Sequence, residues 1–471
     1  MPTLTGSALN TLKAALDGAL LPPGTGDYER AQLGFNRIVR GRPAAVVRAA
    51  DAADVAACVR FAADHGLPLA VQATGHGVSV PADGALLIDT RDMDEVRIDP
   101  GTRTARIGAG ASWSQVVQAA AAHGLAPLNG AAPSVGAVGY TLGGGLGPLG
   151  RSYGYSADHV RCLDVVTADG TLHRVTADSH ANLFWGLRGG KGNFGVVTAM
   201  EVALFPVPSL YGGGLFLPAD RPDRLLRAWR DWTRAIPDAM QSSLALGPFP
   251  PDDALPPQVR GRFLAHIRVA FNGPAQEGEA LVRPLRQHGE PVADTLTDRP
   301  YAQVAAIHLD PTEPGVYYER STRLRTLDDT TIDTLAALAE EGAVAWRPNI
   351  ELRHLGGALA RRPRHPNAVP YREAAYTLFS GARTATDDEA AVAADYQDRL
   401  IGAMGPWRIG GPFLSFISAR EPTDMHLRSA YDPDTYQELV QLKDVWDPGN
   451  IFRVNHNIPP TTLPPTGQGQ G

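Results

Sequence analysis

Gln72-Ala73-Thr74-Gly75-His76-Gly77-Val78 is the stretch of sequence on which the interpretation of this chain depends. It follows a short apolar run, residues 67–71, which has the length and composition of a buried strand. The two glycines beside His76 predict a tight turn, and a ligand can approach the backbone there closely because neither glycine carries a Cβ. A histidine in such a turn is either a surface or a hydrogen-bonded residue, or a catalytic one, and these interpretations stay open on this stretch alone.

A second glycine-rich stretch, residues 135–147, reads Val-Gly-Ala-Val-Gly-Tyr-Thr-Leu-Gly-Gly-Gly-Leu-Gly. Two such loops in the first third of the chain predict a large anionic cofactor held by backbone N–H groups. A close-packed turn without a ligand is the alternative for this second stretch. A nicotinamide-binding fingerprint fits poorly, because the glycines do not follow the first strand of a βαβ unit and Pro148 disfavours a helix directly after them.

Composition bounds the possible functions. The 471 residues are enough for two domains, and 43 basic against 50 acidic residues give a net charge of -7, which argues against nucleic acid or an anionic membrane surface as the main partner. The two cysteines, Cys58 and Cys162, lie in apolar segments and predict buried thiols, with neither a disulfide framework nor zinc spacing. No signal-peptide pattern and no apolar run of about 18 residues is visible, so we expect a soluble, cytoplasmic protein without a membrane or metal site.

The predicted elements change in character near Pro206-Val207-Pro208. Residues 40–205 alternate short strands and helices, whereas longer strands and helices follow, in the pattern of an antiparallel sheet covered by helices. The fold class is therefore α+β. Among the individual elements, the pattern predicts a helix over 7–20, a strand over 67–71, a helix over 51–65 that ends at Gly66, and a strand over 345–352.

Seven short motifs occur in the order found in one known family: Thr74-Gly75-His76-Gly77, Pro133-Ser134-Val135-Gly136, residues 143–147, residues 153–158, residues 183–190, residues 192–198, and residues 446–452 with 455–458. Together they resemble the FAD-linked oxidases of the vanillyl-alcohol-oxidase or p-cresol-methylhydroxylase (PCMH) type, and within these the berberine-bridge-enzyme-like oxidoreductases. The resemblance spans nearly the whole chain.

The resemblance implies a two-part FAD domain with an inserted substrate domain. Residues 1–205 and 425–460 would form the PCMH-type FAD domain. Residues 206–424 would form the substrate domain, an antiparallel sheet with helices, and residues 461–471, rich in Pro, Thr, Gly and Gln, would be a disordered tail. The extended FAD would have its pyrophosphate held by the two glycine-rich loops.

The resemblance also implies how FAD is attached. The histidine at the position of His76 bonds to the flavin 8α-methyl in this family, and the position of a second, cysteinyl bond is Ala132 here, so we expect monocovalent FAD. Val135 matches the position that governs oxygen access. The residues implied to bind FAD beside His76 are Gln72, Ala73, Thr74, Gly75, Gly77, Val78, Ala132, Pro133, Ser134, Val135, Gly136, Gly139, Tyr140, Gly143, Gly144, Gly145, Leu146, Val196, Val197, Asn455 and Asn457.

The implied reaction is hydride transfer from a small molecule to flavin N5, with dioxygen reoxidising the flavin. Tyr153 and Tyr140 are each either a catalytic residue beside the flavin or a packed aromatic, and Tyr371 is a further candidate. Glu351 is either a solvent-facing residue paired with Arg353 or a desolvated base with a raised pKa.

One departure from the family bears on the substrate. Sugar-oxidising relatives carry a tyrosine base in a Tyr-Val-Asn element, where this chain has Phe413-Leu414-Ser415-Phe416. We therefore expect a larger, more apolar substrate, as in bacterial flavoenzymes that tailor specialised metabolites such as polyketides. A carbohydrate or alcohol oxidase and a catalytically inactive flavin-bearing protein remain alternatives. The expected state is a monomer or homodimer.

Overall fold

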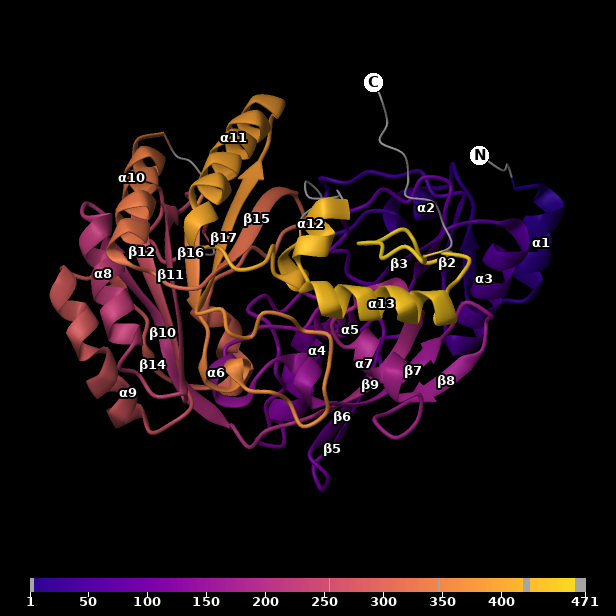
Figure 1. Ribbon diagram of the computed structural model, residues 1–471, viewed down its shortest axis with the longest axis horizontal. Coiled ribbons are helices and arrows are strands. Elements are labelled where there is room, and N and C mark those ends of the chain that lie inside the picture. The colour runs from indigo at the N-terminus through magenta and orange to yellow at the C-terminus, as the bar shows by residue number, and fades with distance from the viewer. Residues whose placement is uncertain (1–3, 254, 346–347, 418–423, 462–471) are drawn as a thin grey trace.

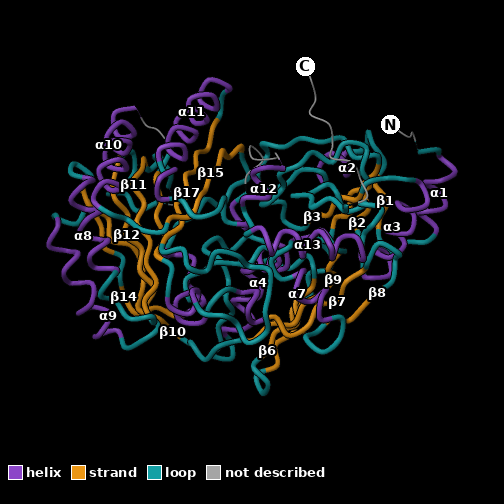
Figure 2. Tube along the Cα trace, viewed as in Figure 1, coloured by secondary structure: helices purple, strands orange, loops and turns teal. Residues whose placement is uncertain are grey.

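The computed structural model describes residues 4–253, 255–345, 348–417 and 424–461. Helices and sheets are mixed, and the described chain forms two halves, visible in Figure 1 as a large sheet with its helices on the left and smaller sheets on the right. This confirms the predicted α+β class. Figure 2 shows how much of the region between the halves is loop.

The first sheet carries the histidine turn. Its strand order is β1-β2-β4-β3, with β2, β4 and β3 parallel to one another and β1 antiparallel to β2. Helix α3 packs on it and follows its local signals: Asp51 accepts hydrogen bonds from Ala53 N and Asp54 N, and Gly66 ends the helix at φ 65°. The bounds here are α1 (Gly6–Ala14), β1 (Ala19–Leu21), α2 (Gly26–Ala31), β2 (Ala45–Arg48), α3 (Ala52–His65), β3 (Leu69–Gln72) and β4 (Leu86–Asp89).

The second sheet has the order β5-β6-β9-β7-β8 and is antiparallel throughout. Its core also takes residues from the C-terminal helix α13, which lies along this half in Figure 1. The bounds are β5 (Val96–Asp99), β6 (Thr104–Gly108), α4 (Trp113–Ala121), α5 (Ala137–Leu142), α6 (Gly150–Tyr153), β7 (Val160–Val166), β8 (Leu172–Val175), α7 (Ala181–Leu187), the 3-10 helix η2 (Lys191–Asn193), β9 (Val196–Ala203), α12 (Asp424–Ser429) and α13 (Pro433–Trp446).

The third sheet has eight strands, in the order β13-β10-β12-β11-β16-β17-β15, with β14 paired to β10. All its pairings are antiparallel. The bounds are β10 (Ser209–Pro218), α8 (Pro222–Thr233), β11 (Met240–Pro248), β12 (Phe263–Phe271), α9 (Ala275–Val282), β13 (Ala293–Asp294), β14 (Thr297–Pro300), η4 (Tyr301–Ile307), β15 (Val316–Leu324), α10 (Asp329–Ala345), β16 (Ile350–His354), β17 (Tyr376–Thr384), α11 (Asp387–Ala403) and η7 (Leu414–Phe416).

The two faces of this sheet differ because side chains alternate along each strand. Leu244, Leu352 and Leu378 share a core with residues of α8, α10 and α11. The residues on either side of Leu352, Glu351 and Arg353, point to the opposite face and line a cavity. One face of the sheet thus builds the core of the substrate half, and the other is free to carry polar chemistry.

Several predicted elements differ from the structure. The helix expected over 7–20 is α1, which ends at Ala14, and residues 19–21 form strand β1. Ala345 ends helix α10, so the strand expected over 345–352 is β16, which begins at Ile350. Several elements had no prediction, among them strand β15 and helix α5 inside the second glycine-rich stretch.

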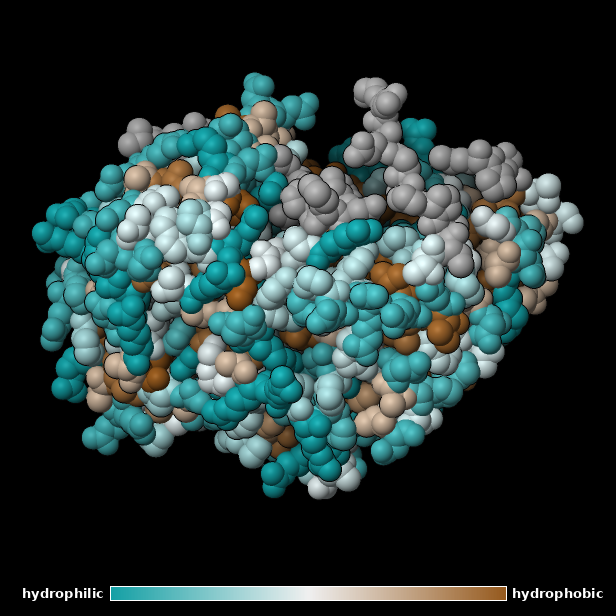
Figure 3. Space-filling model, viewed as in Figure 1, coloured by the Kyte–Doolittle hydropathy of each residue, from teal (hydrophilic) through white to brown (hydrophobic). Residues whose placement is uncertain are grey.

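We propose 1–205, 206–424 and 425–460 as the domain limits, since β10, the first strand of the large sheet, begins at Ser209. Of the predicted tail, 461–471, only Thr461 belongs to the described residues, and its amide donates to Asp444. The helices of the described residues are all too short or too polar to cross a membrane. On the face shown in Figure 3, hydrophilic residues predominate and apolar ones occur in small groups.

Candidate functional site

A cavity of about 940 Å³ lies where the two halves meet. One wall is the polar face of the large sheet. The other walls are the loops around residues 72–80, 130–139 and 191–197, together with the C-terminal segment near residues 452–456. A cavity of this size between domains is typical of a site for a cofactor or a small molecule.

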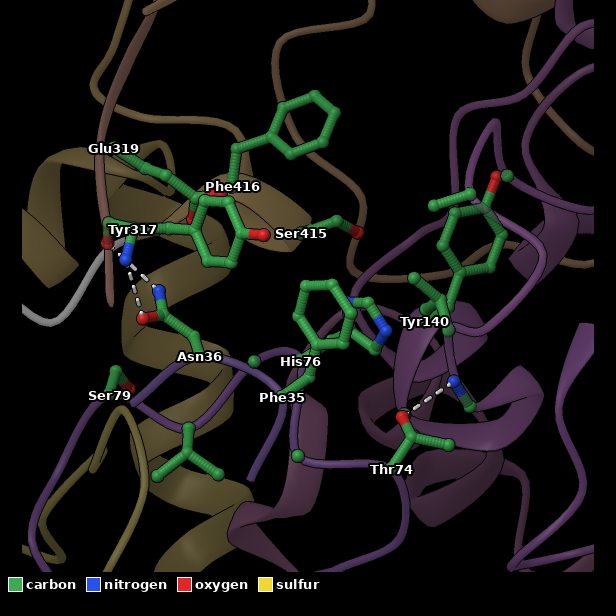
Figure 4. A pocket seen from close by; sticks show the side chains of 18 of the residues that line it. Phe35, Asn36, Thr74, His76, Ser79, Tyr140, Tyr317, Glu319, Ser415 and Phe416 are labelled. Carbon is green, nitrogen blue, oxygen red and sulfur yellow. Dashed lines mark hydrogen bonds between the residues drawn. The ribbon is translucent and has the colours of Figure 1, made fainter. Parts of the chain in front are cut away.

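His76 lies in the wall of this cavity (Figure 4). Its Nε2 is 2.9 Å from Ser134 Oγ, and its ring stacks on Phe35 with 3.7 Å between the ring centroids. Burial lowers the pKa of His76 to about 4, so the imidazole is neutral at physiological pH. The histidine is therefore held in place and uncharged in the wall of the cavity.

The glycine before His76 has a steric reason. Gly75 has φ 72°, and a Cβ at this position would lie 2.3 Å from Gly34 Cα. Its carbonyl accepts a hydrogen bond from Asn36 N, so the turn is paired with the 34–36 segment. Thr74 Oγ1 accepts a hydrogen bond from Gly136 N at 3.0 Å, which joins the two predicted cofactor loops (Figure 4).

Most residues predicted to bind FAD are brought together here. Those that line the cavity are Gln72, Ala73, Thr74, Gly75, His76, Gly77, Val78, Ala132, Pro133, Val135, Gly136, Gly139, Tyr140, Leu146, Val196, Val197 and Asn455. Ser134 does not line the cavity itself but contacts His76, which does. Gly143, Gly144, Gly145 and Asn457 are not among the lining residues.

The triple glycine is better explained by packing than by a ligand. Gly145 has φ 76°, and a Cβ there would lie 2.5 Å from the ring of Tyr140. Gly143 accepts a hydrogen bond from Ser415 through its carbonyl, and a Cβ on Gly144 would press on Val369. For residues 143–145 the close-packed turn is thus the interpretation that the contacts favour.

Lys191 and His456 are cavity residues that sequence reasoning missed. Lys191 Nζ donates to Leu414 O at 2.8 Å and lies 3.3 Å from His456 Nδ1. Burial lowers the pKa of Lys191 to about 8. The sequence shows Lys191 among glycines and His456 in a motif near the C-terminus. Only the fold brings these two residues together.

The cavity walls formed by the loops around residues 72–80, 130–139 and 191–197 and by the segment near residues 452–456, called the FAD side below, have the features of a cofactor site. His456 Nε2 and Asn455 Oδ1 are buried without a hydrogen-bond partner among the described residues. A Cβ added at Gly77 or Gly139 would meet no protein atom within 4 Å, so the cavity has free space beside the backbone of both loops. A large polar ligand can form hydrogen bonds with such unpaired side-chain atoms and with backbone groups that no side chain covers.

Glu351 lies in the opposite wall, between two arginines. Its carboxylate is 2.7 Å from Arg268 and is hydrogen-bonded to Nε of Arg353. The residue is 2% exposed, so the solvent-facing interpretation is wrong, although its pairing with Arg353 is confirmed. Burial alone would raise the pKa of Glu351, but Arg268 and Arg353 outweigh it and hold the pKa well below its ordinary range. The expected raised pKa is therefore wrong.

The three tyrosine candidates occupy different places. Tyr140 lines the cavity, but its ring packs edge-on against Trp113, and its hydroxyl has no partner among the described residues. Tyr153 accepts from Asn272 and stacks on Phe205, and Tyr371 donates to Tyr431 O. Tyr153 and Tyr371 are not among the residues that line the cavity, and we do not retain them as catalytic candidates.

Glu319 and Asp310 are carboxyl groups in the cavity that had no prediction. Burial, followed by repulsion from Asp310, raises the pKa of Glu319 to about 7. Burial also raises the pKa of Asp310, and Arg268 opposes that shift. The segment Val-Tyr-Tyr-Glu-Arg-Ser-Thr-Arg-Leu, residues 316–324, is rich in β-branched and aromatic residues, and this signal identifies the strand that carries Glu319.

Ser415 and Phe416, the part of the chain that departs from the sugar-oxidising pattern, both line the cavity. The guanidinium of Arg353 lies 4.9 Å from the centre of the Phe416 ring. The segment that replaces the tyrosine-containing element of sugar-oxidising relatives thus places the apolar ring of Phe416 in the cavity, beside Arg353.

Comparisons with known proteins agree with this geometry. The model of the FAD binding domain matches residues 43–176, and the model described as berberine and berberine like matches residues 416–459. The chain is 30% identical over 436 residues to (R)-6-hydroxynicotine oxidase of Paenarthrobacter nicotinovorans, which covers 89% of this chain and 92% of that protein.

Solved structures show the same fold. The crystal structure of 6-hydroxy-D-nicotine oxidase from Arthrobacter nicotinovorans matches with a TM-score of 0.81 and 26% identity, over 94% of this chain and 98% of that one. A carbohydrate oxidase from Microdochium nivale matches with a TM-score of 0.82 at 19% identity, over 97% and 100% of the two chains. Since an oxidase of 6-hydroxy-D-nicotine and an oxidase of carbohydrates share this fold, the fold alone does not identify the substrate of this chain.

The matched domains and the cavity are those of an FAD-linked oxidoreductase. The chain belongs to the berberine-bridge-enzyme-like family of FAD-linked oxidoreductases, as its motifs indicated, and is an enzyme of a family that includes oxidases.

Proposed function

We propose that the protein is an oxidase whose FAD is bonded to His76, and that it oxidises a specialised metabolite by hydride transfer to flavin N5, with dioxygen as the electron acceptor. The observation that carries this proposal is the position of His76: neutral, held by Ser134 and Phe35, and facing the FAD side of the cavity. FAD, when bound, supplies the two-electron acceptor and its reaction with dioxygen.

The hydrogen bond of His76 favours one ring nitrogen for the link. Nε2 is occupied by Ser134 Oγ, which leaves Nδ1 for the bond to the 8α-carbon. In that bond His76 would supply the ring nitrogen and give up the imidazole proton, and the 8α-methyl would give up one hydrogen as hydride. Dioxygen would take up the two electrons and two protons as hydrogen peroxide. Because Ala132 has no thiol, we propose a single tether.

The remaining cavity residues have supporting roles in this proposal. The backbone near Gly77 and Gly139, with Asn455 and His456, would bind the cofactor through polar groups that are otherwise unpaired. The sheet face across the cavity would bind the substrate. Val135, which lines the cavity, would limit the space through which dioxygen reaches the flavin.

Acid denaturation tests the tether. We expect the flavin to stay with the protein, on the peptide that contains His76, and the His76→Ala variant to release all its flavin into the supernatant. His65→Ala is the matched control, because His65 is exposed and does not line the cavity. Flavin that stays covalently bound in the His76→Ala variant refutes the assignment.

A second measurement tests the oxidase proposal without a known substrate. The photoreduced holoenzyme should return to the oxidised spectrum when air is admitted, with release of hydrogen peroxide. A flavin that cannot be reduced and reoxidised would instead support an inactive flavin-bearing protein.

A further inference from the structure

We propose that the part of the cavity formed by Glu319, Asp310 and His308 binds a protonated amino group of the substrate. The inference rests on the proposed function, because it assumes that the substrate lies across the cavity from His76. It adds the chemical class of the substrate, an organic amine that also carries apolar or aromatic bulk.

Glu319 is placed to bind a ligand, since its carboxyl group lines the cavity without a partner among the described residues. It lies on β15 opposite Gly381 of β17, which has no side chain to fill the space beside it. Within residues 4–253, 255–345, 348–417 and 424–461, no hydrogen bond or ion pair reaches its carboxyl group. Burial of a carboxylate without a partner is unfavourable, so a bound cation would stabilise this wall.

Asp310 and His308 come from a different element, the segment that follows η4. Leu309 between them has φ 56°, a backbone conformation that non-glycine residues rarely adopt. His308 is 8% exposed and lines the same cavity, and its Nδ1 has no hydrogen-bond partner among the described residues. Burial lowers the pKa of His308 well below its ordinary value, so the neutral ring offers an acceptor or a donor to a ligand.

When all its groups are ionised, the sheet side of the cavity has one more negative than positive charge. Two guanidinium groups, Arg268 and Arg353, face three carboxyl groups, Glu351, Asp310 and Glu319. Both arginines are already engaged by Glu351. The other charged residues near this wall, Arg383, Glu313 and Asp252, line the cavity but are exposed, where water screens them.

Aromatic rings complete the site. Tyr317, Phe379 and Phe416 line the cavity, and Figure 4 shows Glu319, Tyr317 and Phe416 together on one side of it. Aromatic faces beside carboxylates bind organic ammonium groups through cation–π and ionic attraction. A metal ion is a poor occupant, because within the described part of the chain no group of three His, Cys, Asp or Glu residues is placed to hold one.

The test uses three ligands of nearly the same shape: tryptamine (a cation), tryptophol (neutral) and indole-3-acetate (an anion). Each is titrated into the FAD-loaded holoenzyme at pH 8, and binding is followed by the change in flavin absorbance. We expect tryptamine to bind at least about tenfold more tightly than tryptophol, as an ionic hydrogen bond in a partly buried site provides.

Glu319→Gln and Asp310→Asn should each reduce this ratio, and the double variant should remove it. Glu313→Gln is the matched control, since Glu313 lines the same cavity but is exposed, and it should keep the ratio. The flavin content and far-UV spectrum of each variant show that it is folded.

Equal binding of tryptamine and tryptophol, absence of tryptamine binding, tighter binding of indole-3-acetate, or a preference that survives in the double variant would each overturn the proposal. These outcomes are separate from a failure of the proposed function. Release of the flavin by acid refutes the His76 tether, but the titration with bound flavin still reports on the amine site.

Discussion

The ring of Phe35 lies parallel to the imidazole of His76, with 15° between their planes, and the ring of Tyr317 stacks 5.5 Å beyond Phe35. Asn36 holds this arrangement by donating from Nδ2 to Tyr317 O and accepting at Oδ1 from Tyr317 N. An N-terminal segment thus connects the histidine turn of one half to strand β15 of the other, beside the cavity.

Phe35 should position His76 for bond formation with the flavin. In the Phe35→Ala variant the imidazole loses its stacking surface, and we expect covalent incorporation of FAD into the apoprotein to slow by at least about tenfold, the effect of about 1.4 kcal/mol. Phe35→Tyr should restore the rate. The measurement is the fraction of acid-stable flavin against time. Phe249→Ala, which removes a ring from the cavity wall away from His76, should leave that time course unchanged.

Ser134 should fix the orientation of the same imidazole through its 2.9 Å contact with Nε2. Loss of one such hydrogen bond is worth about 0.5–1.5 kcal/mol, so Ser134→Ala should slow covalent incorporation by about two- to tenfold, and Ser134→Thr should be close to wild type. An incorporation rate that is identical in Ser134→Ala would show that the hydroxyl has no part in the reaction.

Glu351 should stabilise the fold at neutral pH, because its pKa is lowered in the folded state by Arg268 and Arg353. This stabilisation is fully present above the pKa of an unfolded glutamate, about 4.3, and is lost progressively as the pH falls from there through the lower pKa of the folded state. Glu351→Gln should therefore lower the free energy of unfolding at pH 7 by about 3 kcal/mol, and by a smaller amount at about pH 3.

Denaturant unfolding at both pH values measures this difference. Glu95→Gln is the matched control, because Glu95 pairs with Arg97 at the same spacing but on the surface, where such a pair contributes little. If Glu351→Gln is as stable as wild type at pH 7 but reduces its flavin slowly, Glu351 acts in catalysis and not in the stability of this wall.

Glu319 should have the opposite pH dependence. Its pKa is raised to about 7 in the folded state, so its contribution to stability is fully present below the unfolded pKa and is lost as the pH rises toward 7. Glu319→Gln should raise the melting temperature of the ligand-free protein at pH 8 and leave it unchanged near pH 4. Glu313→Gln should show no such gain at pH 8. A lower melting temperature of Glu319→Gln at pH 8 would mean that the carboxylate has a stabilising partner.

Lys443 should anchor the C-terminal helix α13 to the cofactor half. Both Lys443 and Asp447 have fully buried side chains 2.6 Å apart, and Lys443 Nζ also donates to Asn193 O. Lys443→Met leaves the buried Asp447 carboxylate without its counter-ion, with only hydrogen bonds from Ile451 N and Phe452 N, which should cost about 3 kcal/mol of unfolding free energy. The double variant Lys443→Met, Asp447→Asn should be less destabilised than the single one. Urea unfolding of both, with the exposed Lys13→Met as control, measures this coupling.

Local signals predicted the elements whose hydrogen bonds close within a few residues. Asp51 and Gly66 bound α3 as expected, and Ser112 begins α4 with a capping box to Gln115. The turn at His76 was predicted for the same reason, since Gly75 adopts φ 72°, which favours glycine locally. Strand β15 was missed although residues 316–324 contain β-branched and aromatic residues, because Glu319, Arg320 and Arg323 interrupt the apolar pattern of a strand.

The sequence by itself predicted the fold class, the family and most of the residues that we propose to hold the cofactor, because those residues occur in short contiguous motifs with recognisable glycine turns. Only the tertiary structure decided the other half. Arg268 and Glu351 come from different strands, and their contact inverts the pKa shift that burial alone would give. Likewise, Glu319 and Asp310 come close enough to repel each other only when β15 and the segment after η4 line one cavity. Charge interactions depend on distance in space, and in this protein the fold sets those distances.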